Sequence, residues 1–285
     1  MPTKFLANLS ALAPAYDVIL SDVWGVVHNG VVATEPACDA LARFRARGGI
    51  VVLITNAPRP GEVVKAFLDG VKVPPDAYDG IVSSGDVTRA LMITRAGERI
   101  FHIGPERDVP MFAGLVRVSN LEVCDYVVCS GLHDDTTETP ADYDGTLAAM
   151  GARGLMMLCA NPDVVVERGP ELVYCAGAIA ERYAAAGGQV IYAGKPHAPI
   201  YDQALALAQS LRGRSTDRAR VLAIGDSVRT DIKGASDYGL PSLFVTAGIH
   251  AEELGGRENP SLSALANIFA AADLRPIAVM RQLEW

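Results

Sequence analysis

The chain has 285 residues, of which 50% are hydrophobic and 20% are charged, a balance that supports a folded core and argues against extensive disorder. The net charge of −8, without a dense stripe of lysine and arginine, argues against nucleic acid as a partner. No apolar run approaches the roughly 20 residues needed to cross a bilayer, so we expect no membrane segment and a cytoplasmic location. The five cysteines lack CxxC spacing and are expected to be buried thiols.

Strand-like and helical stretches alternate from the start of the chain. The apolar runs DVILSD (17–22) and GIVVLITN (49–56) flank a stretch of helical period, which predicts two strands joined by a helix. Both runs are apolar on both faces, as is typical of parallel sheets covered by helices. Polar residues at the carboxyl ends of such strands line the ligand crevice.

The same alternation returns near the end of the chain and predicts the rest of a doubly wound, Rossmann-like α/β sheet. Its segments are QVIYAGK (189–195), PIYDQALALAQSL (199–211), RVLAIGD (220–226), SVRTDIKGASDYG (227–239) and PSLFVTAG (241–248).

A second α/β set lies between these two blocks. It includes RIFHIGP (99–105), DYVVCSG (125–131), GLMMLCA (154–160) and the helical CAGAIAERYAAAGG (175–188). We therefore expect residues 85–189 to form an α/β domain inserted into a discontinuous core of residues 1–84 and 190–285. A single continuous doubly wound domain is the alternative.

Two strand ends in the first block carry polar side chains. Asp22 ends a buried strand, where a carboxylate can act as a nucleophile or a metal ligand, although taken alone it is better explained as a turn cap. Thr55 and Asn56 follow the next strand and can donate hydrogen bonds to an anion, although Thr-Asn commonly makes turns.

Two further sites lie in the last block. Lys195 stands between glycine and proline, and its compact ammonium suits a phosphoryl oxygen or paired carboxylates. Asp226 follows the strand RVLAI directly, and Asp231 lies five positions later. These acids can hold a hard cation such as magnesium, or can serve as a helix cap and a first-turn charge.

The order Asp, Thr, Lys, Asp at successive strand ends resembles the haloacid dehalogenase superfamily of phosphoryl-transfer enzymes. The span from Asp22 to Asp231 covers 210 of the 285 residues. The large insertion between Thr55 and Lys195 is similar to the subgroup with an α/β cap at this position. The first motif, DVWG, resembles that of uncharacterised hydrolases, and more distantly the branch with 4-nitrophenylphosphatase, phosphoglycolate phosphatase, pyridoxal phosphatase and the phosphatase of the N-acetylglucosamine operon.

The resemblance implies a magnesium-dependent phosphatase that acts on a small phosphorylated metabolite, with its oligomeric state left open and a homodimer as one alternative. It implies that Asp22 is the nucleophile that forms an aspartyl-phosphate. It implies the following further roles: magnesium ligands Asp22, Asp226 and the backbone carbonyl of Trp24; phosphate ligands Thr55, Asn56 and Lys195; and Asp231 as the group that orients Lys195 or a metal-bound water.

Trp24 departs from the resembled family, because the usual motif has a second aspartate here that protonates the leaving oxygen and then activates water. Indole cannot transfer that proton, and losing such help typically costs roughly 10² to 10⁴ in rate. His28 in the same loop is a candidate substitute, although a lone loop histidine is more often a bystander. The alternative function is therefore a phosphoryl-binding or regulatory protein with little turnover.

Two other segments invite a functional interpretation. ADYDGTL (141–147) spells the usual family signature more closely than DVWG does, but it follows polar sequence rather than a buried strand. We therefore expect Asp142 and Asp144 to be helix-start acids without a catalytic role. CANPD (159–163) offers Asn161 and Asp163 to a substrate, but an Asn-Pro turn after a strand is the favoured interpretation.

Overall fold

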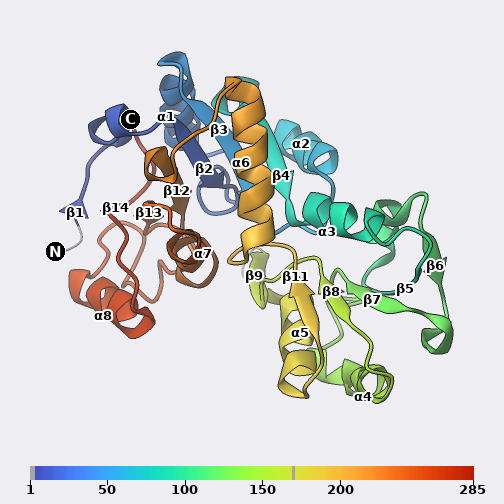
Figure 1. Cartoon of the computed structure of the whole chain (residues 1–285). Coiled ribbons are helices and arrows are strands. Elements are labelled where there is room, and N and C mark those ends of the chain that lie inside the picture. The colour runs from blue at the N-terminus through green and yellow to red at the C-terminus, as the bar shows by residue number, and fades with distance from the viewer. Residues whose placement is uncertain (1–3, 169–170) are drawn as a thin grey trace. The chain divides into compact units, whose positions relative to one another are not determined.

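The computed structural model describes residues 4–168 and 171–285, which fall into two compact units (Figure 1). Unit 1 comprises the described residues up to Thr55 together with Lys65–Val82 and Tyr201–Trp285. Unit 2 comprises Asn56–Val64 and the described part of Ser83–Ile200. The assignment of 85–189 as an inserted domain stays a prediction.

Unit 1 is built on a seven-stranded sheet with the strand order β1-β14-β13-β12-β2-β3-β4. The neighbouring pairs from β1 to β3 are all parallel, which confirms the predicted doubly wound parallel sheet. The strands are β1 (Lys4–Phe5), β2 (Val18–Asp22), β3 (Ile50–Thr55), β4 (Gly80–Ser83), β12 (Val221–Gly225), β13 (Ser242–Val245) and β14 (Ala278–Met280).

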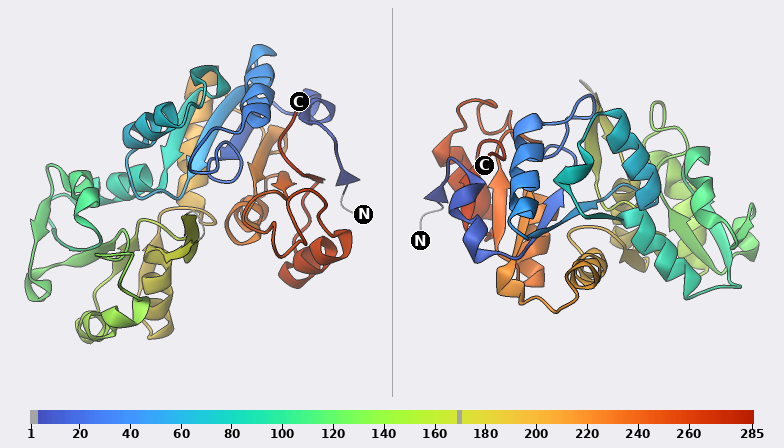
Figure 2. Two further views of the ribbon diagram at one scale, coloured as in Figure 1. Left: turned by 180° about the vertical axis from the view of Figure 1, so that it is seen from behind. Right: turned by 90° about the horizontal axis from the view of Figure 1, so that it is seen from above.

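The helices that follow these strands are divided between the two faces of the sheet. The β2–α1–β3 crossover moves along the sheet in one direction, and the β12–α7–β13–α8–β14 path moves in the other. Right-handed crossovers then place α1 opposite α7, as the views in Figure 2 show. The helices that lie wholly in unit 1 are α1 (Glu35–Ala46), α7 (Lys233–Tyr238) and α8 (Leu262–Ala272). The helices α2 (Gly61–Gly70) and α6 (Ala198–Arg212) begin in unit 2 and continue into unit 1.

Helix α1 shows how local sequence sets these elements. It has a proline in its first turn, Glu35 at its start, and Arg43 and Arg45 in its last turn, which complement the helix dipole. Its buried side is lined by small and apolar residues, Ala37, Cys38, Ala40, Leu41 and Phe44. Short helical turns complete unit 1: η1 (Leu9–Ala11), η2 (Ala13–Ala15), η3 (Pro75–Ala77), η7 (Arg218–Arg220) and the π-helix η8 (Val228–Ile232).

The direction of winding reverses between β2 and β12, which are neighbours in the sheet. Their register pairs Val18 with Val221 and Ser21 with Ile224, so both strands end at the same edge. All residues of β2 and β12 are buried, and the two strands form the centre of the sheet. In open α/β sheets, ligands bind outside the carboxyl ends of the strands at such a reversal.

Unit 2 contains a five-stranded parallel sheet with the order β11-β8-β7-β5-β6 and a separate antiparallel hairpin of β9 and β10. The strands are β5 (Arg99–Ile103), β6 (Val116–Val118), β7 (Tyr126–Cys129), β8 (Met157–Cys159), β9 (Val165–Arg168), β10 (Glu171–Tyr174) and β11 (Val190–Tyr192). The helices are α3 (Ser84–Ile93), η4 (Glu106–Phe112), η5 (Leu121–Val123), η6 (Pro140–Tyr143), α4 (Asp144–Ala152) and α5 (Ala176–Ala185).

Alternate residues of the unit 2 strands supply two hydrophobic clusters. Val127 belongs to the cluster that includes Met150 of α4 and Ile179 of α5, whereas Val128 belongs to the cluster that includes Met92 of α3. This alternation follows from the period of two in a strand, and it explains why the central strands β7 and β8 are apolar on both faces.

Candidate active site

Three buried carboxylates gather in unit 1. Asp22 is the last residue of β2, Asp226 directly follows β12, and Asp231 lies in η8. One ligand oxygen from each lies within 4.8 Å of the others, and the residues are only 7%, 5% and 4% exposed. The cluster therefore sits at the carboxyl ends of β2 and β12, where the winding of the sheet reverses. The sequence predicted the strand-end positions of Asp22 and Asp226.

Backbone groups and glycines hold Asp226 in place. Its Oδ2 accepts a hydrogen bond from the Ile249 N–H at 2.8 Å. A Cβ added to Gly248 would lie 1.9 Å from this oxygen, and one added to Gly25 would lie 2.0 Å from it. Gly25 also has φ +82°, which disfavours any other residue. The DVWG and TAG segments can therefore approach Asp226 this closely only because residues 25 and 248 are both glycine.

Asp231 is positioned by the turn that opens η8. Its Oδ2 accepts from the Ser227 N–H at 3.0 Å, and its own N–H donates to the Ser227 carbonyl at 3.0 Å. A Cβ on Gly225 would lie 2.1 Å from the Asp231 Cγ. The carboxylate is thereby held against the end of β12.

The composition of this cluster fits a hard divalent cation. Three carboxylates buried together repel one another and lose hydration, and both costs fall when a cation lies among them. Magnesium and calcium take oxygen ligands of this kind, whereas zinc usually takes histidine or cysteine. The donor set thus suits the predicted magnesium.

Thr55 ends β3 at the same edge of the sheet. The register pairs Asp22 with Ile54, so Thr55 is the next residue along β3 and is buried. Its hydroxyl remains a candidate phosphate ligand, as the sequence predicted.

Trp24 and His28 form an aromatic group with Phe67 of α2. The Trp24 and His28 ring centroids are 5.0 Å apart, and those of His28 and Phe67 are 5.3 Å apart, both in edge-on geometry. The Trp24 residue is 41% exposed, whereas His28 is buried. A Cβ on Gly30 would lie 2.6 Å from the Trp24 Cη2, so the indole packs directly over that glycine.

His28 is poorly suited to replace the missing acid. Its Nδ1 accepts a hydrogen bond from the Gly30 N–H at 2.8 Å, so this nitrogen carries no proton. Burial lowers the pKa of the imidazole to about 4, which leaves it neutral near pH 7. The structure therefore argues against His28 as the proton donor.

Lys195 and Asn56 meet in unit 2, although 139 positions separate them in the chain. Both residues are buried. The Asn56 side chain bonds the backbone of Lys195 and the carboxylate of Asp163. Sequence reasoning assigned the Asn56 amide to phosphate, whereas its partners in the structure are protein groups.

The ADYDGTL segment forms the start of a helix, as predicted. The Asp142 Oδ2 accepts from the Thr139 N–H at 2.7 Å and from its hydroxyl at 2.9 Å, which caps η6. Asp144 begins α4 and pairs with Arg182 at 2.6 Å. Both carboxylates are thus occupied in structural contacts, far in sequence from the Asp22 cluster.

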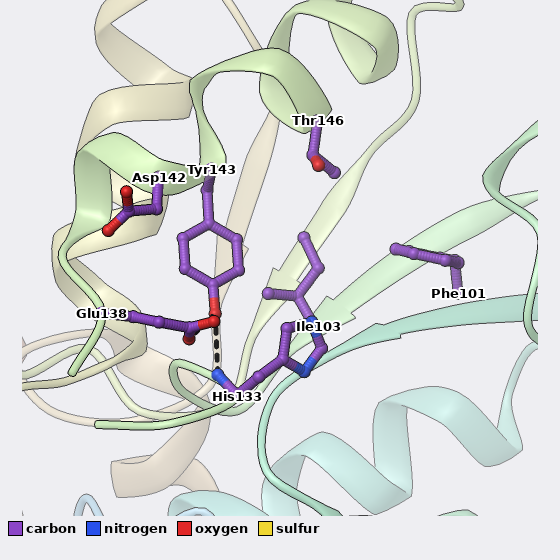
Figure 3. A pocket seen from close by; sticks show the side chains of 7 residues that line it. All are labelled: Phe101, Ile103, His133, Glu138, Asp142, Tyr143 and Thr146. Carbon is purple, nitrogen blue, oxygen red and sulfur yellow. Dashed lines mark hydrogen bonds between the residues drawn. The ribbon is translucent and has the colours of Figure 1, made fainter. Parts of the chain in front are cut away.

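A small pocket of about 170 Å³ lies beside this segment (Figure 3). The Tyr143 hydroxyl donates to Glu138 at 2.6 Å and accepts from the His133 N–H at 2.7 Å. The carboxylates of Glu138 and Asp142, which line the pocket, are therefore held by protein donors, and we assign the pocket no catalytic role. Its lining consists of Phe101, Ile103, His133, Glu138, Asp142, Tyr143 and Thr146.

The CANPD segment makes the predicted turn after β8. The Asp163 N–H donates to the Asn161 Oδ1 at 3.0 Å, a local bond typical of an Asx turn. The contact between Asp163 and Asn56 was not predicted, because nothing in the sequence around residue 163 indicates a partner 107 positions away.

A doubly wound parallel sheet with acids gathered at its reversal point defines a Rossmann-like α/β protein whose acids lie where such sheets bind ligands. Residues 19–115 match the family described as haloacid dehalogenase-like hydrolase, and residues 192–271 match the HAD-hydrolase-like family. A haloacid dehalogenase-like hydrolase from Brucella suis 1330, known from a crystal structure, has 45% sequence identity to this chain. The comparison covers 98% of this chain and 100% of that chain, with a TM-score of 0.86. The chain belongs to the haloacid dehalogenase-like hydrolases, as its motifs predicted.

Two further comparisons are with glycerol phosphate phosphatases of Mycobacterium tuberculosis. D-Glycerol 3-phosphate phosphatase is 30% identical over 249 residues, which cover 85% of this chain and 66% of that relative. A glycerol phosphate phosphatase whose crystal structure was determined in complex with magnesium has 26% sequence identity to this chain, with 94% of this chain and 76% of that chain covered and a TM-score of 0.67.

In the described parts of the present chain, 4–168 and 171–285, no helix has both the length and the hydropathy of a membrane span.

Proposed function

We propose that the protein is a magnesium-dependent phosphatase that hydrolyses a small phosphorylated metabolite through an aspartyl-phosphate on Asp22. The observation that carries this proposal is the buried cluster of Asp22, Asp226 and Asp231 at the reversal point of the sheet. The magnesium-bound phosphatase relative supports the same cation and reaction class.

In the first step, an Asp22 carboxylate oxygen attacks phosphorus. A phosphorus–oxygen bond to Asp22 forms, the ester phosphorus–oxygen bond breaks, and the leaving oxygen keeps the electron pair until it takes a proton. Asp22, Asp226 and the Trp24 carbonyl would hold magnesium, which would offset the repulsion between the carboxylate and the phosphate dianion. Lys195 and Thr55 would bind the phosphoryl oxygens.

In the second step, water attacks phosphorus of the aspartyl-phosphate and releases a proton to solvent, the bond from phosphorus to Asp22 breaks, the Asp22 carboxylate is restored, and inorganic phosphate leaves. The proposed role of Asp231 is to orient Lys195 or the water. Because Trp24 offers no ionisable group and His28 stays neutral, the proton for the leaving oxygen would come from solvent. We therefore expect turnover to be slow for esters whose leaving group is a strong base.

Phosphate release from a panel of phosphate esters, with and without magnesium, tests the proposal. Asp22→Asn keeps the size of the side chain but removes the nucleophile, so it should abolish release. Asp142→Asn is the matched control, because Asp142 caps η6 and should leave release unchanged. Full activity in Asp22→Asn would overturn the assignment.

Trp24 favours a second candidate, a phosphoryl-binding or regulatory protein that keeps the fold and turns over little. It predicts that the parent protein releases almost no phosphate while a stable aspartyl-phosphate on Asp22 accumulates. Intact-protein mass spectrometry after incubation with a phosphate donor detects that adduct. Rapid turnover by the parent would exclude this candidate.

A further inference from the structure

We propose that Asn56 is a positioning residue that holds the backbone of Lys195, and that Asp163 fixes the orientation of the Asn56 amide. The inference rests on the proposed function, because it concerns the placement of the lysine that would bind phosphate. It gives Asn56 a role different from the phosphate contact that its place after Thr55 suggested.

Three hydrogen bonds carry the argument. The Asn56 Oδ1 accepts from the Lys195 N–H at 2.7 Å, and the Asn56 Nδ2 donates to the Lys195 carbonyl at 3.0 Å. The second Nδ2 hydrogen goes to the Asp163 Oδ1, 2.9 Å away. One amide thus pairs with both polar groups of the Lys195 backbone, much as a neighbouring strand would.

The amide has only one orientation that satisfies these partners. An asparagine offers two N–H donors and a carbonyl acceptor. If the amide turned over, its oxygen would face the Lys195 carbonyl and the Asp163 carboxylate, and its NH₂ group would face the Lys195 N–H. Such mismatches among buried groups are costly, so the Asp163 carboxylate acts on Lys195 through Asn56.

The surroundings leave little room for another arrangement. A Cβ on Gly194, the residue before Lys195, would lie 2.4 Å from the Asn56 Oδ1. Asp163 is itself anchored, because its N–H donates to Asn161 at 3.0 Å and its carbonyl accepts from the Gly177 N–H at 3.1 Å. A fixed turn therefore supports the amide, and the amide supports the backbone of Lys195.

The need for this support follows from the nature of lysine. Its ammonium is a point charge on a flexible four-carbon stem, so its position depends on where the backbone and the surrounding wall hold it. Lys195 is only 2% exposed, so its side chain lies within protein rather than in solvent. A small displacement of a group that stabilises the reacting phosphoryl can cost up to about 100-fold in rate.

Variants of the full-length protein test the two links separately. Asn56→Ala removes all three bonds without adding charge and should lower kcat/KM for a phosphate ester by about 10-fold or more. Asp163→Asn keeps an oxygen that can accept from Asn56 and should stay within about threefold of the parent. Asp163→Ala removes that acceptor, and its kcat/KM should be about three- to tenfold below that of the parent, between the values of the other two variants. Thermal unfolding of each variant checks that it is folded.

A double-mutant cycle separates positioning from general damage. The readout is the affinity of inorganic phosphate in the presence of magnesium, measured by calorimetry, which needs no turnover. Asn56→Ala should weaken phosphate binding in the parent but have no further effect in a Lys195→Ala background, because the positioned charge is already gone. An equal loss in both backgrounds, or unchanged affinity in Asn56→Ala, would overturn the inference.

The proposed function and this inference fail in distinguishable ways. A parent that neither releases phosphate from esters nor binds inorganic phosphate would overturn the proposed function and the inference with it. A parent that does both, with Asn56→Ala equal to it in both measurements, would overturn the positioning role alone.

Discussion

Replacing Trp24 with aspartate should raise phosphate release from esters of ordinary alcohols. An aspartate at this position brings the ionisable group that indole lacks, while the backbone carbonyl proposed as a magnesium ligand is retained. General acid catalysis contributes roughly 10² to 10⁴ in rate. We expect a gain of about this size for alkyl phosphates and a much smaller one for 4-nitrophenyl phosphate, whose leaving group is a weak base and needs little protonation.

The same change should cost stability. Trp24 is 41% exposed, and its ring packs against His28 and over Gly30. With somewhat more than half of an aromatic side chain of about 150–250 Å² buried, roughly 100–150 Å² of contact is lost. At about 25 cal/mol per Å², this corresponds to an upper estimate of about 2–4 kcal/mol in the free energy of unfolding.

The assay compares kcat for an alkyl and an aryl phosphate in the parent, Trp24→Asp and Trp24→Asn. The asparagine variant loses the same packing and has nearly the same shape as aspartate, but it carries no ionisable proton. Only Trp24→Asp should accelerate the alkyl ester. If Trp24→Asn matched it, or if the parent hydrolysed both esters equally fast, the reasoning about the missing acid would be refuted.

Asp226→Asn removes one charge from the carboxylate cluster and should weaken magnesium binding sharply, whereas Asp142→Asn should leave magnesium affinity unchanged. Calorimetric titration of both variants measures this. Weaker binding in Asp142→Asn with normal binding in Asp226→Asn would show that the carboxylate cluster is the wrong metal site. Gly248→Ala places a Cβ 1.9 Å from an Asp226 oxygen and should also reduce magnesium affinity in the same titration, so normal affinity would argue against this contact. Hydrogen bonds from Arg220 lower the pKa of Asp17 to about 2, below its ordinary value of 3.8. The resulting stabilisation is present above about pH 4 and is lost as the pH falls towards 2. Asp17→Asn should therefore lower the free energy of unfolding at pH 7 by about 2 kcal/mol at most, and by less at pH 3. A difference between variant and parent that does not change with pH would contradict this.

Sequence reasoning succeeded where local pattern and chemistry coincide. The strand ends at Asp22, Thr55 and Asp226 were predictable because long apolar runs end there in polar residues. Parallel pairing then brings such ends to one edge regardless of the detailed packing. Their catalytic roles stay predictions, whereas their places in the sheet of unit 1 are now observed.

Other features depend on partners that no local pattern reveals. The Asn56 amide was assigned to phosphate because it follows Thr55, yet its bonds reach Asp163 and Lys195, 107 and 139 positions away. The hairpin of β9 and β10 was not predicted either. In both cases, the determining contact lies outside the window that sequence periodicity samples.

The strand order in the sheet of unit 1 also determines how long each strand remains without its partner while the chain is synthesised. Strand β2 is complete at Asp22, but the neighbour that it pairs with on one side, β12, begins only at Val221. Ribosomes add about 5–20 residues per second, so one edge of β2, a strand that is fully buried in the folded protein, waits about 10–40 s for a partner that is about 200 residues away. During that interval β2 and β3 can pair with each other and pack on α1. The strands of the five-stranded sheet, which lie between residues 99 and 192, are also synthesised in that interval and can pair with one another before β12 exists. Chaperone demand during synthesis should therefore centre on the segment around β2, and slow translation before Val221 should increase aggregation of the nascent chain.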